Sequence, residues 1–476
     1  MERIVAAVRR TTTGRLGSSG RVVIVAGMAG SARALLVAAL ERRTGRPVIF
    51  VTGSAREAEE LQPGVEFFHA ALGPGLARSS SSHGGVVALP SSESDPYDGT
   101  SPHAEVLEQR ALYLYRAAAG GSASPRILIT SIRALAERTV PPDVLKSSGL
   151  ALHAGDEMPI ELIVDLLISS GYVRQEPIGS EGEFSSRGGI LDVFSAAHEA
   201  PHRIEFFGDV VESIREFDVD SQRSTGRVNE SIIAPMRELC VRREEFMSWA
   251  GVAREKWPDI RFKRDLQSRL GHAGRGEPFP GWEYLLPLTR PLTSSALDYF
   301  DDALIVIDEP AGIEKAATDF YDAMESRFAR ADDAGELALR PAALFLTPDE
   351  LGGRLAAMDR VELRLLGRTA ATIDDQFRIE SLTLPDPAGI LAGPAGPAAH
   401  PNDPSNKSAF GQSDLAELPE SGNPDVQSAK VFLFPFSDRT PEVSIISQSA
   451  KRYRGRVQEV AFDAASDSKD GRTVLF

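Results

Sequence analysis

The first 140 or so residues alternate between short apolar runs rich in β-branched residues and longer helical patterns. Helices are predicted over Ser31–Arg43 and from about Ser54, whose hydroxyl is a plausible N-cap. The apolar runs predict strands at Arg21–Val25, Val48–Val51, Val86–Leu89 and Ile127–Thr130. Strands that alternate with helices in this way form parallel sheets with crossover helices. The sequence therefore predicts an α/β fold.

A different pattern occupies Gly182–Ser224, where apolar and polar residues alternate singly. A strand of this period points Ile204 and Phe206 to one face, and Arg203, Glu205 and Phe207 to the other. Gly208-Asp209 then has the length and composition of a two-residue hairpin turn. The segment predicts a compact antiparallel β-module that can bury one face and expose the other.

The predicted outer face carries a phenylalanine beside an arginine. A large aromatic side chain flanked by charge on an exposed sheet is typical of an anchor for a protein partner. Arg187, in a Ser-Arg-Gly-Gly segment, joins Arg203 and Phe207 if the preceding strands pair as a meander. The alternative is that Phe207 packs beneath a helix and that the arginines are ordinary solvated residues. The pattern alone leaves both hypotheses open.

Later segments define the domain organisation. A strand at Leu304–Ile307 is placed to rejoin the first sheet, which makes the β-module an insertion, and Ala343–Met358 is interpreted as a strand followed by a helix. A stretch dense in Pro, Gly, Ala and Ser predicts a linker before four final apolar runs. The expected boundaries are a first α/β part at 1–142, the inserted α+β module at 143–225, completion of the α/β core at 226–383, the linker at 384–428 and a partial α/β domain at 429–476.

Composition narrows the possible functions. The 476 residues carry a net charge of −16, which argues against broad nonspecific nucleic-acid coating. A local basic cluster at Lys451–Arg456 either touches nucleic acid or is a solvated turn. Cys240 is the only cysteine, which excludes disulfides and cysteine-rich zinc sites within the chain. The start has no signal-peptide pattern and no apolar run approaches bilayer length, so a cytoplasmic location is expected.

Gly27–Ala34 lies between a strand and a helix, the place of a phosphate-binding P-loop. A working loop follows G-x-x-x-x-G-K-[ST], in which the lysine reaches the phosphates and the hydroxyl holds magnesium. Gly27 and Gly30 remain, but Ala32 replaces the second required glycine, Arg33 the lysine and Ala34 the hydroxyl. A helix N-terminus still attracts anions. Hydrolysis is not expected, and the favoured interpretation is a former nucleotide loop retained for packing.

Asp308-Glu309 follows the Leu304–Ile307 strand in the manner of a Walker B motif. These carboxylates could hold magnesium only beside a working phosphate loop. We therefore interpret them as structural, and we expect no catalytic residue, metal or cofactor in this chain.

The segment GEFSSRGGILDVFSAAHEAPHRIEFFGDVVESIREFDVDSQRS resembles domain 2 of the bacterial transcription-repair coupling factors (Mfd family) and, more distantly, of the excision-repair subunit UvrB. The resemblance implies that this domain binds the repair protein UvrA. The arginine of the family's R-G motif, the arginine before its hairpin strand and the phenylalanine four residues later correspond here to Arg187, Arg203 and Phe207.

The resemblance extends over most of the chain through further short strings in the family's order: LPSSESDPYD, SPHAEV, GWEYLLPL and the pair Asp298-Tyr299. It implies UvrB-like domains 1 and 2, the first similar to half of a RecA-like motor core, and the start of domain 3. UvrB itself carries a long aromatic hairpin, whereas here Tyr97 is the only aromatic between Pro96 and Arg110. Probing bases needs several exposed rings.

The implied function is that of a monomeric adaptor that mimics UvrB and recruits UvrA in transcription-coupled nucleotide excision repair. Full-length members of the family add an ATP-driven DNA translocase that releases stalled RNA polymerase. The resemblance therefore assigns ATP, magnesium, DNA and RNA polymerase to parts that residues 1–476 do not resemble, and it predicts that the chain stops inside a domain. The alternatives are an active UvrB-type ATPase and an inert remnant without either activity.

Overall fold

The computed structural model describes residues 4, 20–28, 30–73, 85–365 and 442–444. Within them, a seven-stranded parallel sheet has the order β17-β1-β16-β15-β2-β4-β3. Its strands are β1 (Val22–Ala26), β2 (Val48–Thr52), β3 (Val86–Leu89), β4 (Ile127–Ser131), β15 (Leu304–Asp308), β16 (Arg360–Arg364) and β17 (Glu442–Ser444). The predicted α/β fold is confirmed.

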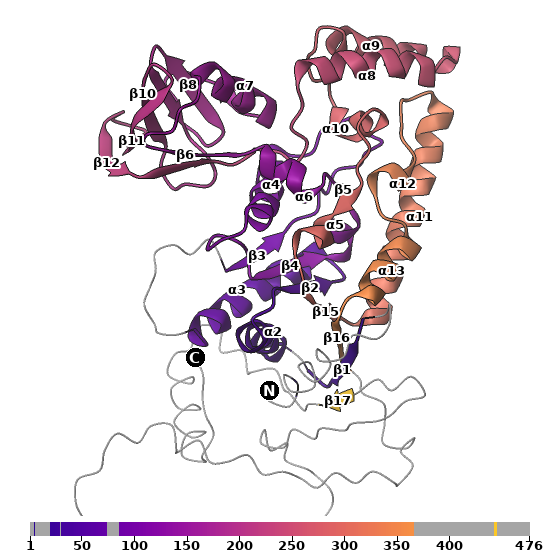
Figure 1. Cartoon of the computed structure of the whole chain (residues 1–476). Coiled ribbons are helices and arrows are strands. Elements are labelled where there is room, and N and C mark those ends of the chain that lie inside the picture. Colours follow the sequence, from indigo (N-terminus) through magenta and orange to yellow (C-terminus); the bar gives the residue numbers. More distant parts are fainter. Residues whose placement is uncertain (1–3, 5–19, 29, 74–84, 366–441, 445–476) are drawn as a thin grey trace, which may run out of the picture.

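Helices cover both faces of this sheet (Figure 1). Helices α2 (Ser31–Thr44) and α3 (Ala55–Ala71) pack on one face, around buried Phe50 and Val306. The other face packs around Ile49 and Ile305 and is covered by α4 (Ala104–Ala119), α5 (Ile132–Ala136), α11 (Pro310–Ala334) and α13 (Pro348–Ala357). Strands that are buried on both faces have continuous apolar sequences, which explains why these strands could be predicted from the sequence.

The chain leaves this core through β5 (Arg138–Thr139) and α6 (Pro142–Ser147), and then builds the β-module that stands to one side of the core in Figure 1. Its six-stranded sheet has the order β12-β11-β10-β9-β8-β7. The bounds are β7 (Val173–Arg174), β8 (Glu183–Arg187), β9 (Ile190–Val193), β10 (His202–Phe207), β11 (Val210–Phe217) and β12 (Ser224–Val228). All pairs are antiparallel except β7 with β8, which is parallel.

Helix α7 (Ile160–Ser170) covers the inner face of this sheet, with Ile163 and Leu167 against Phe184 and Ile204. A two-stranded ribbon of β6 (Leu150–His153) and β13 (Glu230–Ile233) closes the module, so its strands continue past residue 225. Strand β15 then returns to pair with β2 and β16, which confirms that the module is an insertion.

A helical cluster follows the module: α8 (Arg243–Lys256), α9 (Lys263–Ala273) and α10 (Trp282–Leu285) pack around Trp249. Helix α11 rises from the sheet toward this cluster (Figure 1). Short elements complete the core: β14 (Ser294–Ser295), which pairs with β5, α12 (Pro341–Leu344) and the 3₁₀ turns Ile260–Phe262, Leu286–Leu288 and Ala296–Tyr299.

Local signals in the sequence located several elements well. Ser54 caps α3 through a capping box with Glu57, and Gly171, at φ 101°, ends α7. Within Ala343–Met358, the expected helix is confirmed as α13, but the strand expected before it is wrong. Two short helices, each with proline in its first turn, precede β16, because proline favours a helix N-terminus. The expected linker and the cluster Lys451–Arg456 lie outside the described residues.

A buried ion cluster joins the module connector to the core. The Arg110 side chain of α4 is only 3% exposed and contacts two carboxylates, Glu137 at 2.9 Å and Glu238 at 2.5 Å. Ser92 donates two further hydrogen bonds to Glu137, at 2.8 and 2.9 Å. The two carboxylates raise the pKa of Arg110 against the opposing effect of burial. Since Glu238 directly follows the module, this arginine ties the module's exit to the first half of the core.

We expect Arg110→Ala to destabilise the chain by about 3 to 5 kcal/mol, because it leaves two carboxylates buried without their cation. Urea unfolding followed by circular dichroism measures the change. Arg56→Ala is the matched control, since Arg56 lies on the surface of α3 and its ion pair is with exposed Glu60, which predicts little or no loss of stability. Equal losses in the two variants would contradict the role of the buried cluster.

Two histidines stack inside the module. The rings of His198 and His202 lie 4.1 Å apart between centroids, and His202 Nδ1 is 2.9 Å from Ser231 Oγ. His198 Nε2 accepts a hydrogen bond from the backbone N–H of Ile232 at 2.8 Å, so this nitrogen carries no proton. Burial lowers the pKa of both rings to about 4, and for His198 a charge on His202 lowers the pKa further.

This pair predicts acid sensitivity. A histidine whose pKa is lower in the folded than in the unfolded chain contributes stability above its ordinary pKa near 6.5, and that contribution is lost as the pH falls toward 4. We expect the free energy of unfolding to drop by about 2 kcal/mol for each of the two rings over this range. Urea unfolding at pH 7, 5.5 and 4.5 tests this. The drop should shrink in His198→Gln/His202→Gln and persist in His153→Gln, whose side chain is 53% exposed.

Candidate protein-interaction surface and degenerate nucleotide loop

Strand β10 separates its side chains as its alternation predicts. Ile204 and Phe206 are buried against α7, whereas Phe207 is 81% exposed. The hairpin turn is Gly208-Asp209, with Phe207 paired to Val210 and Gly208 at φ 62°, a left-handed conformation that glycine adopts without strain. The alternative hypothesis, that a helix covers Phe207, is wrong: α7 packs on the opposite face.

Two more apolar side chains lie on the same face. Val210 is opposite Phe207 on β11 and 40% exposed, and Ile190 is opposite Glu205 on β9 and 41% exposed. Sequence reasoning missed both. Their signal was the same single alternation, since each precedes a residue that is buried, Val211 and Leu191. The exposed face thus has an apolar centre contributed by three strands.

Arg203 borders this centre in a fixed orientation. Its Nε and Nη2 donate to the two carboxylate oxygens of Asp192, at 2.7 and 2.8 Å, and its guanidinium carbon lies 4.7 Å from the centroid of the Phe217 ring. Asp192 is opposite Arg203 in the β9–β10 ladder. The hydrogen bonds that Arg203 donates to Asp192 raise the pKa of the guanidinium. A two-point pair that also stacks on an aromatic ring holds the arginine in one conformation.

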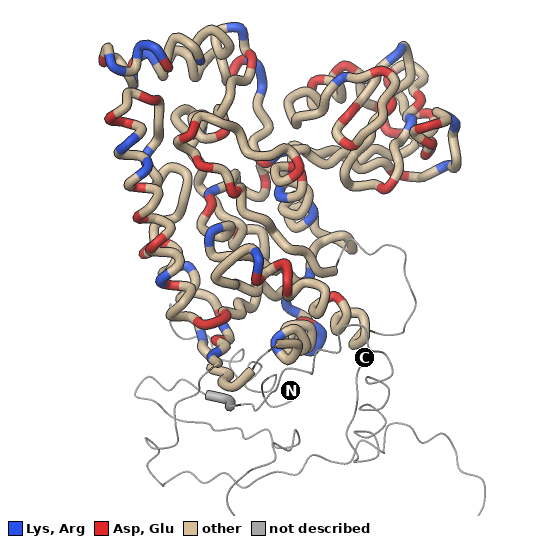
Figure 2. The backbone as a smooth tube through the Cα atoms, turned by 180° about the vertical axis from the view of Figure 1, so that it is seen from behind, with Lys and Arg blue, Asp and Glu red and all other residues tan. Residues whose placement is uncertain are grey.

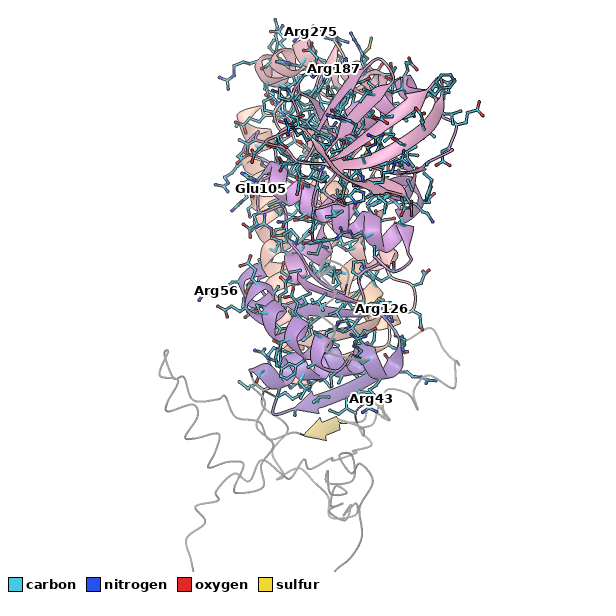
Figure 3. The ribbon with its side chains drawn as sticks, turned by 90° about the vertical axis from the view of Figure 1, so that its left-hand side faces the viewer. Arg43, Arg56, Glu105, Arg126, Arg187 and Arg275 are labelled. Carbon is cyan, nitrogen blue, oxygen red and sulfur yellow. The ribbon has the colours of Figure 1, made fainter. Side chains whose placement is uncertain are left out.

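Arg187 reaches the same face from the end of β8. It is opposite Ile190, which is opposite Glu205, so cross-strand pairing places Arg187 on the side of Phe207. Its side chain is 63% exposed and forms an ion pair with Glu176 (Figure 3 labels it near the upper edge of the module). The structure therefore brings Arg187, Arg203 and Phe207 together on one exposed sheet face.

The former phosphate loop is closed by the protein's own groups. The backbone N–H of Gly27 donates to the carbonyl of Arg364 at 2.8 Å, and Gly30, at φ 53°, caps α2. Arg33 forms an ion pair with Asp308, whose side chain is 11% exposed. Burial raises the pKa of the Asp308 carboxyl, and Arg33 opposes this effect. The two degenerate motifs are thus in contact, and the charge of Arg33 in one is balanced by the carboxylate of Asp308 in the other.

The remaining positions of the two motifs serve packing. Ala34 is buried in the core, and a Cβ at Gly64 of α3 would lie only 3.2 Å from its Cβ. Ala32 packs partly buried beside the same core. Glu309 accepts a hydrogen bond from the backbone N–H of Leu365. These residues do not fit a magnesium nucleotide, since arginine replaces the required lysine at position 33, alanine replaces the required hydroxyl at position 34, and Asp308 is paired with Arg33.

Other ligand chemistry has little support in the described residues. They contain no group of three His, Cys, Asp or Glu side chains that could hold a metal ion. Tyr97, the one aromatic in the segment where UvrB places its hairpin, is 8% exposed and donates to the Leu339 carbonyl at 3.1 Å. No helix in the described part combines the length and the apolar character that a bilayer-spanning segment requires.

The structure defines an α/β domain that carries an inserted β-module with an exposed apolar and charged face. Residues 150–239 match the family described as UvrB interaction domain. The chain is 30% identical over 355 residues to the transcription-repair-coupling factor of Myxococcus xanthus, a match that covers 72% of this chain and 29% of that protein. It is 27% identical over 350 residues to that of Escherichia coli K12, covering 73% and 29%. The factor of Mycobacterium bovis is 34% identical over 204 residues, covering 42% and 15%.

The chain belongs to the transcription-repair-coupling factor family, in which it corresponds to an N-terminal region. This confirms the family resemblance of the sequence. The matches span less than a third of the length of the Myxococcus xanthus and Escherichia coli relatives.

The closed loop predicts that ATP with magnesium does not bind at Gly27–Ala34. Isothermal titration of the chain with ATP and magnesium should give no heat of binding at millimolar nucleotide. The variant Ala32→Gly/Arg33→Lys/Ala34→Ser, which rebuilds the P-loop pattern, is the informative comparison. A dissociation constant below about 100 μM for the unaltered chain, or about −5.5 kcal/mol, would contradict the prediction.

Proposed function

We propose that this chain is the adaptor region of a transcription-repair coupling factor and that its β-module recruits UvrA through Arg187, Arg203 and Phe207. The observation that carries the proposal is the 81% exposure of Phe207 beside two arginines on a rigid sheet. Leaving a phenylalanine in water has a free-energy cost that folding normally avoids by burial. An aromatic anchor between arginines is the composition enriched in the energetic centres of protein interfaces.

The match of residues 150–239 to the UvrB interaction domain supports the same partner. UvrB and the coupling factors would then present equivalent faces, so that UvrA is captured at the site where transcription has stalled. The names of the curated relatives, which join transcription to repair, agree with such a role.

The competing function, an active UvrB-type ATPase, is disfavoured by the ion pair between Arg33 and Asp308. A phosphate would have to displace a partly buried carboxylate from its guanidinium partner, and Ala34 stands where the P-loop pattern requires the hydroxyl that binds the metal. The adaptor function needs neither group. ATP-driven translocation on DNA and the release of RNA polymerase would belong to the rest of a full-length member. The full-length protein would act in the cytoplasm. The region formed by this chain would act as a monomer.

Binding of the purified chain to immobilised UvrA, measured by biolayer interferometry, tests the proposal. We expect Phe207→Ala to weaken binding by about 2 kcal/mol, roughly thirtyfold in dissociation constant, because the substitution removes the aromatic ring that would be buried in the partner. Arg203→Ala should weaken it by a similar factor. Phe67→Ala is the matched control, since Phe67 is 47% exposed on α3 of the core.

A thermal melt of each variant separates loss of the surface from loss of the fold. Unchanged affinity in both Phe207→Ala and Arg203→Ala would overturn the site. Absence of any complex between UvrA and the unaltered chain would overturn the function and favour an inert remnant.

A further inference from the structure

The exposed face of the module continues beyond the apolar centre, on the side away from Arg187. Val210 forms a β-bridge with Glu157, in the loop between β6 and α7. The backbone of this loop is also bonded to β11: Val211 donates to the Asp156 carbonyl at 2.9 Å, and Met158 donates to the Asp209 carbonyl at 2.7 Å. Phe207 on β10, Val210 on β11 and Glu157 therefore follow one another across the sheet, and Arg187 on β8 lies in the neighbouring row, which contains Ile190 and Glu205.

The part of this face beyond Val210, away from Arg187, is acidic. Glu157, Asp209 and Glu212 are exposed, and none of the three forms an ion pair within the described residues. Glu212 is the extra residue of the bulge where the β10–β11 register shifts, since Glu205 pairs with Ser213 and Phe206 with Val211. Bulges commonly redirect a side chain next to a functional site. Within the described residues, three carboxylates that form no ion pair therefore lie at or beside the turn of the β10–β11 hairpin.

The part of the face that carries Arg187, Arg203 and Arg215 differs, because each of these arginines is paired with a carboxylate. Arg187, Arg203 and Arg215 each have an acidic partner within the module: Glu176, Asp192 and Glu205. These arginines are neutralised locally and offer directional N–H donors rather than net charge. The carboxylates beyond Val210 are not neutralised. Both signs appear along the module's backbone in Figure 2. Within the described residues, Arg227 on β12, opposite Arg215, is exposed and forms no ion pair, so this face has an unbalanced positive charge at its β12 edge and unbalanced negative charge beside Val210.

We infer that the docking surface has a second, acidic half formed by Glu157, Asp209 and Glu212, which engages lysine or arginine side chains of the protein partner. A partner that fits the whole face presents an apolar recess for Phe207 and Val210, oxygen acceptors toward Arg187 and Arg203, and a basic rim toward Glu157 and Glu212. This inference rests on the proposed function and deepens it, because it adds residues and a charge requirement that neither arginine supplies.

Exposed charges at the rim of an interface act mainly on the rate of association and on its salt dependence. The acidic half should therefore accelerate encounter with UvrA at low ionic strength and lose influence when salt shortens the Debye length from about 10 Å at 0.1 M to about 5 Å at 0.4 M. The apolar centre should be insensitive to salt. These signatures separate the two parts of the surface in a single kinetic experiment.

The test compares two double charge reversals within the same module. Glu157→Lys/Glu212→Lys alters the acidic half. Glu161→Lys/Asp165→Lys changes the net charge equally on the exposed side of α7, which covers the opposite face of the sheet. Association and dissociation rates with UvrA are measured at 50 mM and 400 mM NaCl, beside the unaltered chain and Phe207→Ala.

We expect the first variant to associate about tenfold more slowly at 50 mM NaCl, with most of the difference lost at 400 mM, and the second to behave like the unaltered chain. If the two variants slow association equally, net charge explains the effect and the acidic half is overturned. It is also overturned if Glu157→Lys/Glu212→Lys binds normally while Phe207→Ala is weakened, an outcome that leaves the proposed function standing. Failure of the unaltered chain to bind UvrA would instead remove the proposed function itself.

Discussion

The two-residue period of β10 places Phe206 and Phe207, neighbours in the chain, on opposite faces of the sheet. Phe206 packs with Ile204 above α7, and this burial fixes the register of the strand. A slip by one residue would bury Arg203 and Glu205 and expose the apolar side chains, at a cost of several kcal/mol. Exposure of Phe207 is thus enforced by the core on the other side of the sheet. The arrangement of Arg187, Arg203 and Val210 depends on the same register, because each reaches the surface through cross-strand pairing.

The α/β core positions this surface without nucleotide chemistry. In a P-loop domain, the loop after the first strand and the acidic end of a neighbouring strand hold a ligand between them. Here Arg33 and Asp308 close that space directly, and the backbone amide of Gly27 bonds to the end of β16. A carboxylate inside the protein takes the place that an anionic ligand would have. The architecture that once served a bound phosphate can in this way persist as a stable scaffold, since its charges and amides still find partners.

The inserted module is attached to the core through buried polar and charged groups, and removing one of them would leave its partner buried without a hydrogen bond or counter-charge. Arg110 holds Glu137 of the first half and Glu238 of the returning chain, and Tyr172 of the module donates to the Ala234 carbonyl at 2.7 Å. Buried ion clusters add little net stability compared with apolar packing, but they fix geometry, because only one arrangement satisfies every charge. A module held in one orientation presents its outer face with little loss of conformational entropy when a partner binds, which favours affinity.

The sequence by itself determined the parallel strands, the caps of α3 and α7, the loss of the phosphate-binding groups at Ala32, Arg33 and Ala34, and the in-and-out pattern of β10. All of these depend on residues close together in the chain, so local periodicity and chemistry are sufficient. It failed at the start of Ala343–Met358, where apolar composition alone does not distinguish a strand from a short helix that begins with proline. The tertiary structure decided which side of the β-module is covered, that Arg33 finds Asp308 and that Glu157 lies beside Val210. These contacts join residues from about 50 to 275 positions apart, and only the packing of α7 and the closure of the sheets bring them within reach of one another.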